Sequence, residues 1–181
     1  PNDGSTVEIC EGVKASFMVA GHIMGASLVL VELENARPDG SSVRFVFSGD
    51  LGHYDQPIVK DPATPPNCDY LMCESTYGDR LHGDVDSATQ LARIINEAVE
   101  RRGPILIPAF AVGRTQEVLY MIRELEEQHR IPVLPVIVDS PMASQATQVY
   151  NRWNEEHDEE YASILMKKRH PLRTASMTTT S

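Results

Sequence analysis

The segment that most constrains this chain is the run Val-Arg-Phe-Val-Phe-Ser-Gly-Asp-Leu-Gly at residues 43–52. Its apolar first half predicts a buried β-strand, and Gly49 and Gly52 allow the backbone to turn sharply on both sides of Asp50. A carboxylate directly after an apolar strand is costly unless a metal, another cation or water meets it. Asp50 is therefore interpreted as a metal ligand.

The first half of the chain has the pattern of short strands joined by turns. Further apolar runs predict strands at residues 7–10, 14–20, 28–33 and 70–74, the last of them buried and ending in a glutamate. Turn signals lie at residues 11–12, Glu-Gly, and at residues 37–40, Arg-Pro-Asp-Gly. Short connections of this kind imply antiparallel pairing between neighbouring strands.

The second half alternates helices and strands. A capping box at residues 87–90, Ser-Ala-Thr-Gln, predicts the start of a helix. Its inward face is expected to carry Leu91, Ile94, Ile95, Ala98 and Val99. There follow a predicted strand at 104–107, a helix at 115–128, a strand at 133–138 and a helix from Ser140 toward Trp153. This order predicts a parallel sheet with right-handed crossovers, and the domain boundary is placed between residues 102 and 103.

Three side chains with metal-binding chemistry follow strands directly. They are His22, Asp50 and Glu74, each flanked by glycine or small polar residues. If their strands share one sheet, the three gather at one edge, and an imidazole with carboxylates suits Zn²⁺ or a similar divalent ion. Taken singly, each has a plainer interpretation. His22 would be a hydrogen-bonded loop residue, Asp50 a turn cap, and Glu74 a cap for the turn that follows it.

Five motifs in a fixed order give the chain a closer likeness. They are Gly-His-Ile-Met-Gly-Ala-Ser at 21–27, Ser-Gly-Asp-Leu-Gly at 48–52, Glu-Ser-Thr-Tyr-Gly-Asp at 74–79, Ile-Pro-Ala-Phe-Ala-Val-Gly-Arg-Thr-Gln-Glu at 107–117 and Val-Asp-Ser-Pro-Met-Ala at 138–143. In this order they closely resemble the β-CASP branch of the metallo-β-lactamase superfamily, whose members are RNA-processing nucleases. The resemblance covers about residues 7–179.

The resemblance implies a fold and a set of roles. The fold is of the α/β class: residues 1–102 form part of a metallo-β-lactamase-like αββα sandwich, and residues 103–181 begin a parallel-sheet β-CASP domain. His22 matches a histidine metal ligand, and Asp50 matches the carboxylate that bridges two zinc ions. Glu74 matches an acidic residue that orients the histidine donating a proton to the leaving group. The catalytic residues implied are thus Asp50 and Glu74, and the metal ligands His22 and Asp50.

The same resemblance implies that important parts lie elsewhere. The family's His-x-His-x-Asp-His motif and its later histidine motifs do not occur in these 181 residues. The chain is therefore expected to be a fragment of a longer parent and to be inactive or nearly so by itself, since zinc sites use three or four ligands. The intact parent is expected to cleave phosphodiester bonds of single-stranded RNA, internally or from the 5′ end, through metal-activated hydroxide. Two Zn²⁺ ions are implied, with Mn²⁺ as an alternative.

Two turns in the second half are candidate contacts for substrate. Arg114 follows an apolar run and begins a helix, so its guanidinium and free backbone N–H groups suit a phosphate. Ser140 begins the next helix in the same way. In the plainer interpretation, which is favoured for capping, Thr115 caps the helix and Arg114 is solvated, and Ser140 caps its own helix.

Two other functions stay open. A catalytically dead scaffold subunit is the first, although the visible ligands His22 and Asp50 are intact. A small-molecule hydrolase of the same superfamily is the second. The net charge of −10 argues against broad nucleic-acid binding but not against a local metal-charged cleft. Three cysteines without a CxxC pair indicate reduced thiols in a cytoplasmic protein, no membrane span is expected, and a homodimer is an open alternative to a monomer.

Overall fold

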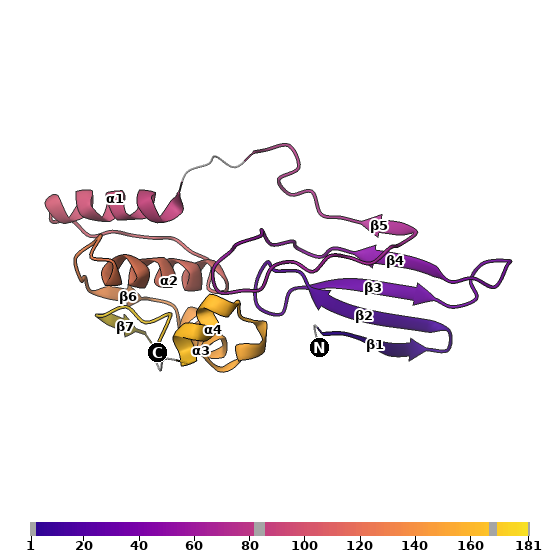
Figure 1. Cartoon of the computed structure of the whole chain (residues 1–181). Coiled ribbons are helices and arrows are strands. Elements are labelled where there is room, and N and C mark those ends of the chain that lie inside the picture. Colours follow the sequence, from indigo (N-terminus) through magenta and orange to yellow (C-terminus); the bar gives the residue numbers. More distant parts are fainter. Residues whose placement is uncertain (1–2, 82–85, 167–169, 181) are drawn as a thin grey trace. The chain divides into compact units, whose positions relative to one another are not determined.

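The computed structural model describes residues 3–81, 86–166 and 170–180. Its contacts divide the chain into two compact units, Pro1–Arg80 and Leu81–Ser181 (Figure 1). The division lies about twenty residues before the expected domain boundary at 102 and 103, because the first helix packs within the second unit. The expected boundary concerns the domains of the parent and stays a prediction.

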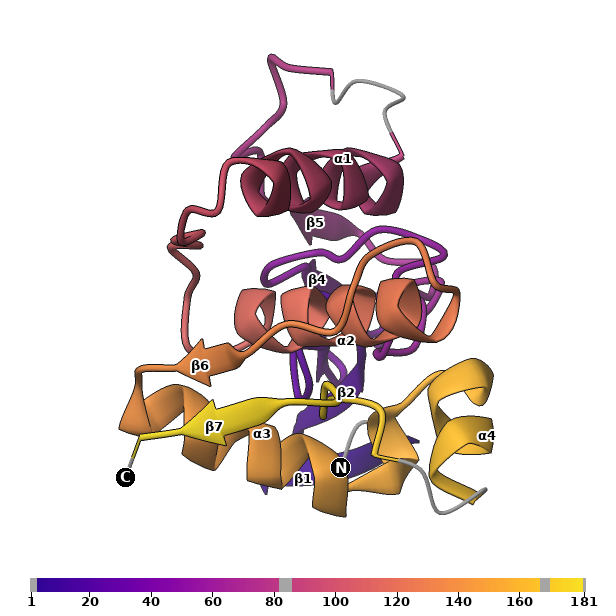
Figure 2. The same cartoon turned by 90° about the vertical axis from the view of Figure 1, so that its left-hand side faces the viewer.

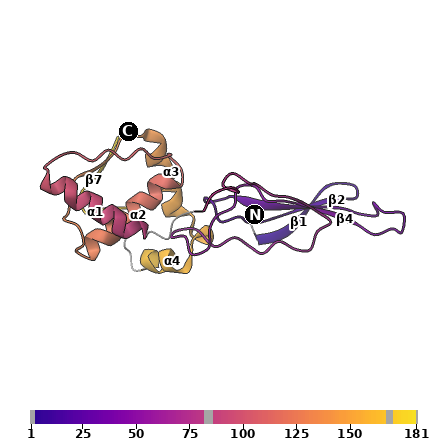
Figure 3. The same cartoon turned by 90° about the horizontal axis from the view of Figure 1, so that it is seen from above.

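The first unit is built on one five-stranded sheet. Its strands are β1 (Asp3–Cys10), β2 (Val13–Val19), β3 (Ser27–Leu33), β4 (Val43–Phe47) and β5 (Tyr70–Met72). They lie in sequence order, and Figure 3 shows them in one thin layer. The pairs from β1 to β4 are antiparallel, as the short turns predicted, whereas β5 runs parallel to β4. The parallel pair requires a long connection, which residues 48–69 provide.

Burial of the last two strands differs from expectation. Only Val46 of β4 is buried, and all three residues of β5 are exposed. The expected burial of residues 70–74 is therefore wrong for β5, which lies at the sheet edge with a partner on one side. Its contacts include the pairing with β4 and the ring of Tyr70 stacked on Phe45, 4.8 Å between centroids.

In the described residues of the second unit there are four α-helices and a parallel strand pair. In chain order they are α1 (Ser87–Glu100), α2 (Arg114–Glu127), β6 (Val136–Val138), α3 (Pro141–Arg152), the 3₁₀ helix η1 (Asn154–Glu156), α4 (Glu159–Met166) and β7 (Met177–Thr179). Figure 2 shows β6 and β7 side by side with the same direction. This confirms the expected α/β class with a parallel sheet in the second half, although β6 pairs with β7 and not with the predicted strand at 104–107. Nowhere in the described part of the chain is a helix long and apolar enough for a membrane span.

One core cluster of this unit lies between α1 and α2. Ala92 and Ile95 of the first helix meet Ile122 and Leu125 of the second, together with Ile131. The expected inward stripe of α1 is partly wrong. Ile94 and Val99 are exposed, because the buried face runs through Ala92, Ile95 and Ala98 instead.

Helix α2 buries polar side chains that its apolar spacing does not indicate. Gln116 is fully buried and donates to the Thr147 hydroxyl on α3, 2.9 Å away. Arg123 donates to the Pro171 carbonyl at 2.9 Å, and Glu126 accepts from the Ala175 N–H at 2.9 Å. The last two bonds fasten the segment before β7 to the helix, although the other carboxylate oxygen of Glu126 is buried without a hydrogen-bond partner among the described residues.

Three local predictions need correction. Residues 104–107 form no strand, because they have no backbone partner among the described residues. The N-cap of α1 is Asp86, which accepts from the N–H groups of Ala88 and Thr89, rather than a capping box begun by residue 87. The N-cap of α2 is Gly113, and Thr115 lies in the first turn with its hydroxyl on the Phe110 carbonyl.

Candidate metal centre

Two turns of the first unit meet backbone to backbone. Gly21 and Leu51 form an isolated antiparallel bridge, and the Gly52 N–H donates to the Ala20 carbonyl at 2.8 Å. The approach is so close that a Cβ on Gly52 would lie 1.9 Å from the Gly21 oxygen. Glycine is therefore required at position 52 by space rather than by backbone angle. The bridge holds the turn of His22 against the turn of Asp50.

Glu74 is tied to the same turns. One of its carboxylate oxygens accepts from the Leu51 N–H at 2.6 Å, and the other accepts from the Thr76 hydroxyl at 2.8 Å. These two bonds, with a smaller contribution from the charge of His22, hold the pKa of the Glu74 carboxyl below its ordinary value. Glu74 is therefore ionised at neutral pH and sits next to the residue that follows Asp50.

Ser48 is a positioning residue that the sequence did not single out. It is buried, its N–H donates to the Met72 carbonyl, and its hydroxyl accepts from the Glu74 N–H at 2.9 Å. The same hydroxyl donates to the Gly49 carbonyl at 2.7 Å. Ser48 thus links the ends of β4 and β5. The serine before the glycine was the only signal for it in the sequence.

The candidate ligands themselves face solvent. His22 and Asp50 are exposed, and Glu74 is partly buried. The structure brings their three turns together at one end of the sheet, as the strand-end argument predicted. Across residues 3–81, 86–166 and 170–180, however, no three His, Cys, Asp or Glu side chains are close enough to hold one metal ion. The assignment of His22 and Asp50 as metal ligands stays a prediction.

The two candidate substrate contacts lie in the second unit. Arg114 begins α2 with a side chain 63% exposed, and its guanidinium pairs with Glu117 at 2.7 Å. Ser140 begins α3, where its hydroxyl accepts from the Ala143 N–H at 3.2 Å with Pro141 in the first helical position. The capping role expected for Ser140 is confirmed. A contact of either residue with substrate stays a prediction.

Comparison with known proteins matches part of the second unit to a known domain. Residues 115–181 match the Beta-Casp domain model. Ribonuclease TTHA0252 of Thermus thermophilus is 33% identical over 163 residues, which are 90% of this chain and 36% of that protein. The matched residues, 115–181, belong to the β-CASP domain family.

Other relatives of this chain come from eukaryotes and archaea. Endoribonuclease YSH1 of Mycosarcoma maydis is 29% identical over 81% of the chain and 16% of its own length. Transcription termination factor FttA of a Lokiarchaeum species is 32% identical over 81% of the chain and 23% of its own length. The chain thus spans about a third or less of these relatives.

Proposed function

We propose that this chain is part of a metal-dependent ribonuclease and supplies His22, Asp50 and Glu74 to its active site. The names of two relatives, a ribonuclease and an endoribonuclease, support RNA cleavage. The observation that carries the proposal is the backbone bridge between Gly21 and Leu51, with Glu74 bonded to the Leu51 N–H. Three residues of suitable chemistry from distant parts of the chain thereby share one small region.

The donor set fits zinc in part. An exposed imidazole and an exposed carboxylate on turns fixed by backbone bonds are suitable Zn²⁺ ligands, and carboxylate also suits Mn²⁺. Two donors do not complete a zinc site, so we propose that the remaining ligands come from the part of the parent outside these residues. The chain alone is then expected to be inactive or nearly so.

Each residue has a defined task in this proposal. His22 and Asp50 would hold the ions. When bound, such ions would supply a water of lowered pKa and would offset charge on the phosphoryl oxygens. Glu74, kept ionised by its bonds to Leu51 and Thr76, has lone pairs left to accept from the imidazole that donates the proton to the leaving group. Arg114 contacts a phosphate of single-stranded RNA, and Ser140 lines the same path.

The proposed setting is cytoplasmic. Cys10, Cys68 and Cys73 are all free and exposed, which suits a reducing compartment. Whether the parent works as a homodimer is a matter for a measurement of its mass in solution.

The test is cleavage of a labelled single-stranded RNA by the full-length parent. We expect Asp50→Ala to abolish cleavage and Glu74→Ala to slow it about 100-fold or more, as for loss of a general acid. Glu11→Ala is the matched control, since Glu11 is an exposed carboxylate in the turn between β1 and β2. Cleavage of a thioester but not of RNA would favour the small-molecule hydrolase, and a native parent that cleaves nothing would favour the scaffold subunit.

A further inference from the structure

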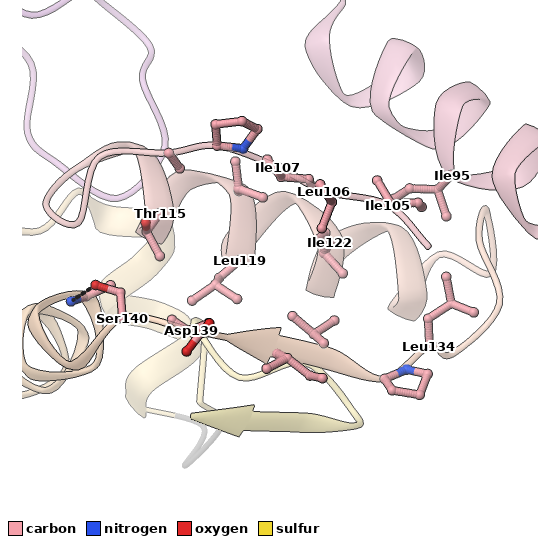
Figure 4. Close-up of a pocket in the computed structure, with 18 of the residues that line it drawn as sticks. Ile95, Ile105, Leu106, Ile107, Thr115, Leu119, Ile122, Leu134, Asp139 and Ser140 are labelled. Carbon is pink, nitrogen blue, oxygen red and sulfur yellow. Dashed lines mark hydrogen bonds between the residues drawn. The ribbon is translucent and has the colours of Figure 1, made fainter. Parts of the chain in front are cut away.

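Two cavities of the second unit have walls of different chemistry. The larger, of about 480 Å³, is lined mainly by aliphatic side chains, such as those of Ile105, Leu119 and Ile122 in Figure 4. The smaller, of about 310 Å³, lies between α3 and residues 170–179. Polar side chains dominate its wall: Ser144, Thr147, Gln148 and Asn151 on the helix, and His170 and Arg173 on the segment opposite. The smaller cavity therefore suits a polar or charged ligand.

One face of α3 forms the first wall. Its four lining residues are spaced at i, i+3, i+4 and i+7 from Ser144, which places their side chains on one side of the helix. Thr147 is fixed there, because its buried hydroxyl accepts from Gln116 at 2.9 Å and donates to the Ala143 carbonyl at 2.8 Å. Gln148 is exposed, and its side chain has no hydrogen bond among the described residues. Its amide is available to a ligand.

A tight turn forms the second wall. The Arg173 N–H donates to the His170 carbonyl at 3.0 Å and closes the turn. Pro171 and Leu172 inside the turn are buried, and the Pro171 carbonyl accepts from the buried Arg123 guanidinium at 2.9 Å. The turn is thus anchored by its own apolar residues and by α2. His170 and Arg173 stay exposed at its two ends and line the cavity.

The charge offered by this wall is positive. Arg173 contributes a guanidinium and His170 an imidazole N–H, and none of the described residues that line the cavity is Asp or Glu. Neither side chain has a hydrogen bond or an ion pair within the described part of the chain. The exposed Arg93 and Arg114, by contrast, each pair with a glutamate on their own helix. In a protein of net charge −10, a cavity that combines an unpaired arginine with amide and hydroxyl donors favours an anion.

We propose that this cavity binds a phosphate group. A phosphate offers several acceptor oxygens and negative charge, and its hydrogen bonds to a guanidinium are charge-assisted. A cation would be repelled by Arg173, and an apolar ligand would leave the donors of both walls without partners. The volume is at the lower end of the range of about 300–1,000 Å³ that is typical of ligand sites, so part of the group that carries the phosphate also fits.

Two sources supply a phosphate of this chemistry. One is the backbone of single-stranded RNA, and the other is a free phosphate ion or small phosphate ester. None of His22, Asp50 and Glu74 lines the cavity, so the inference is independent of the proposed catalytic function.

The test is a titration of the 181-residue chain, followed by NMR at constant ionic strength. Inorganic phosphate is added in one arm and a short single-stranded oligoribonucleotide in the other. We expect the side-chain N–H signals of Arg173 and Gln148 to shift and to saturate in at least one arm. Saturation by RNA alone assigns the site to the RNA backbone, and saturation by inorganic phosphate assigns it to the free ion. No shift in either arm, or the same shifts with sodium chloride, would overturn the proposal.

Substitutions give a second readout from the same titration. Arg173→Gln should weaken binding about 10-fold or more, because it removes a charged hydrogen-bond donor. Arg152→Gln is the matched control. It removes the same charge from the exposed end of α3, but Arg152 does not line the cavity, so binding should weaken by at most about twofold. Equal losses in the two variants would show general attraction of anions and would contradict a site built around Arg173.

Discussion

Replacement of Gly52 by alanine is the sharpest structural test of the candidate metal centre. The new Cβ would lie 1.9 Å from the Gly21 oxygen and 2.7 Å from the His22 nitrogen. An ordinary contact needs about 3.4 Å, so the two turns must separate by roughly 1.5 Å. That separation breaks the bond from the Gly52 N–H to the Ala20 carbonyl.

The cost follows from these distances. Loss of one backbone hydrogen bond costs about 1 kcal/mol, and forced crowding costs about 1–3 kcal/mol. The lower entropy of the unfolded alanine chain offsets about 0.5 kcal/mol. We therefore expect Gly52→Ala to destabilise the first unit by about 2–3 kcal/mol and to displace His22 from Asp50. In the parent a displacement of this size should lower activity about 100-fold.

The assay is hydrogen exchange of the Gly52-region amides in the 181-residue chain, with urea unfolding beside it. Gly25→Ala is the matched control in the facing turn, between β2 and β3: its φ of +85° strains an alanine, but no atom lies within 4 Å of the new Cβ. The control should lose about 1 kcal/mol. If Gly52→Ala is no less stable than Gly25→Ala and keeps its exchange protection, the reasoning about the bridge is refuted.

Three further outcomes are expected. Ser140→Ala should lower stability by about 1 kcal/mol in urea unfolding through loss of the α3 cap, whereas Ser140→Asp should keep most of it; equal loss in both would contradict the cap. The Thr89 hydroxyl and first-turn amides lower the pKa of Asp86. The stability that its ionised carboxylate gives to the fold is therefore present at neutral pH and is lost as pH falls through that lowered pKa. The free energy of unfolding of Asp86→Asn should therefore fall less in acid than that of the native chain. Identical profiles of unfolding free energy against pH would exclude this role. Arg114→Ala should leave stability within about 0.5 kcal/mol, because its pair with Glu117 is exposed, yet reduce the salt slope of RNA binding by about one; an unchanged slope would argue against a phosphate contact.

Much of the site's framework could be predicted because its signals are local. The apolar run before Ser48 and the glycines around Asp50 mark a strand and a turn without reference to any other segment. The same holds for the proline after Ser140, and structure and prediction agree there. Antiparallel pairing of β1 to β4 followed from the short turns between these strands.

The missing parts depend on distant partners. Charged Arg123 and Glu126 suggest a solvent-facing side of α2, yet both are buried because they bond to Pro171 and Ala175, 48 and 49 residues further along the chain. His157 stands in an acidic run, but its ring packs 4.0 Å from that of Tyr161 in the interior. Nothing in the local pattern identifies such partners.

The same limit applies to the bridge between the two metal-site turns. Its contact is backbone to backbone, so no pattern of side chains in the sequence predicts it. The predicted strand at 104–107 failed for the complementary reason: its apolar residues favour a strand, but pairing needs an edge that the described residues do not supply.

The measurement that tests the central claim most directly is the zinc content of the full-length parent, determined for the native protein, His22→Ala and Asp50→Asn. We expect about two zinc ions per native chain and a clear loss in both variants, with folding intact by circular dichroism. Asp50→Asn is suited to this purpose because it preserves the shape of an exposed side chain while removing its charge. Native zinc content in both variants would show that His22 and Asp50 hold no metal and would contradict the account.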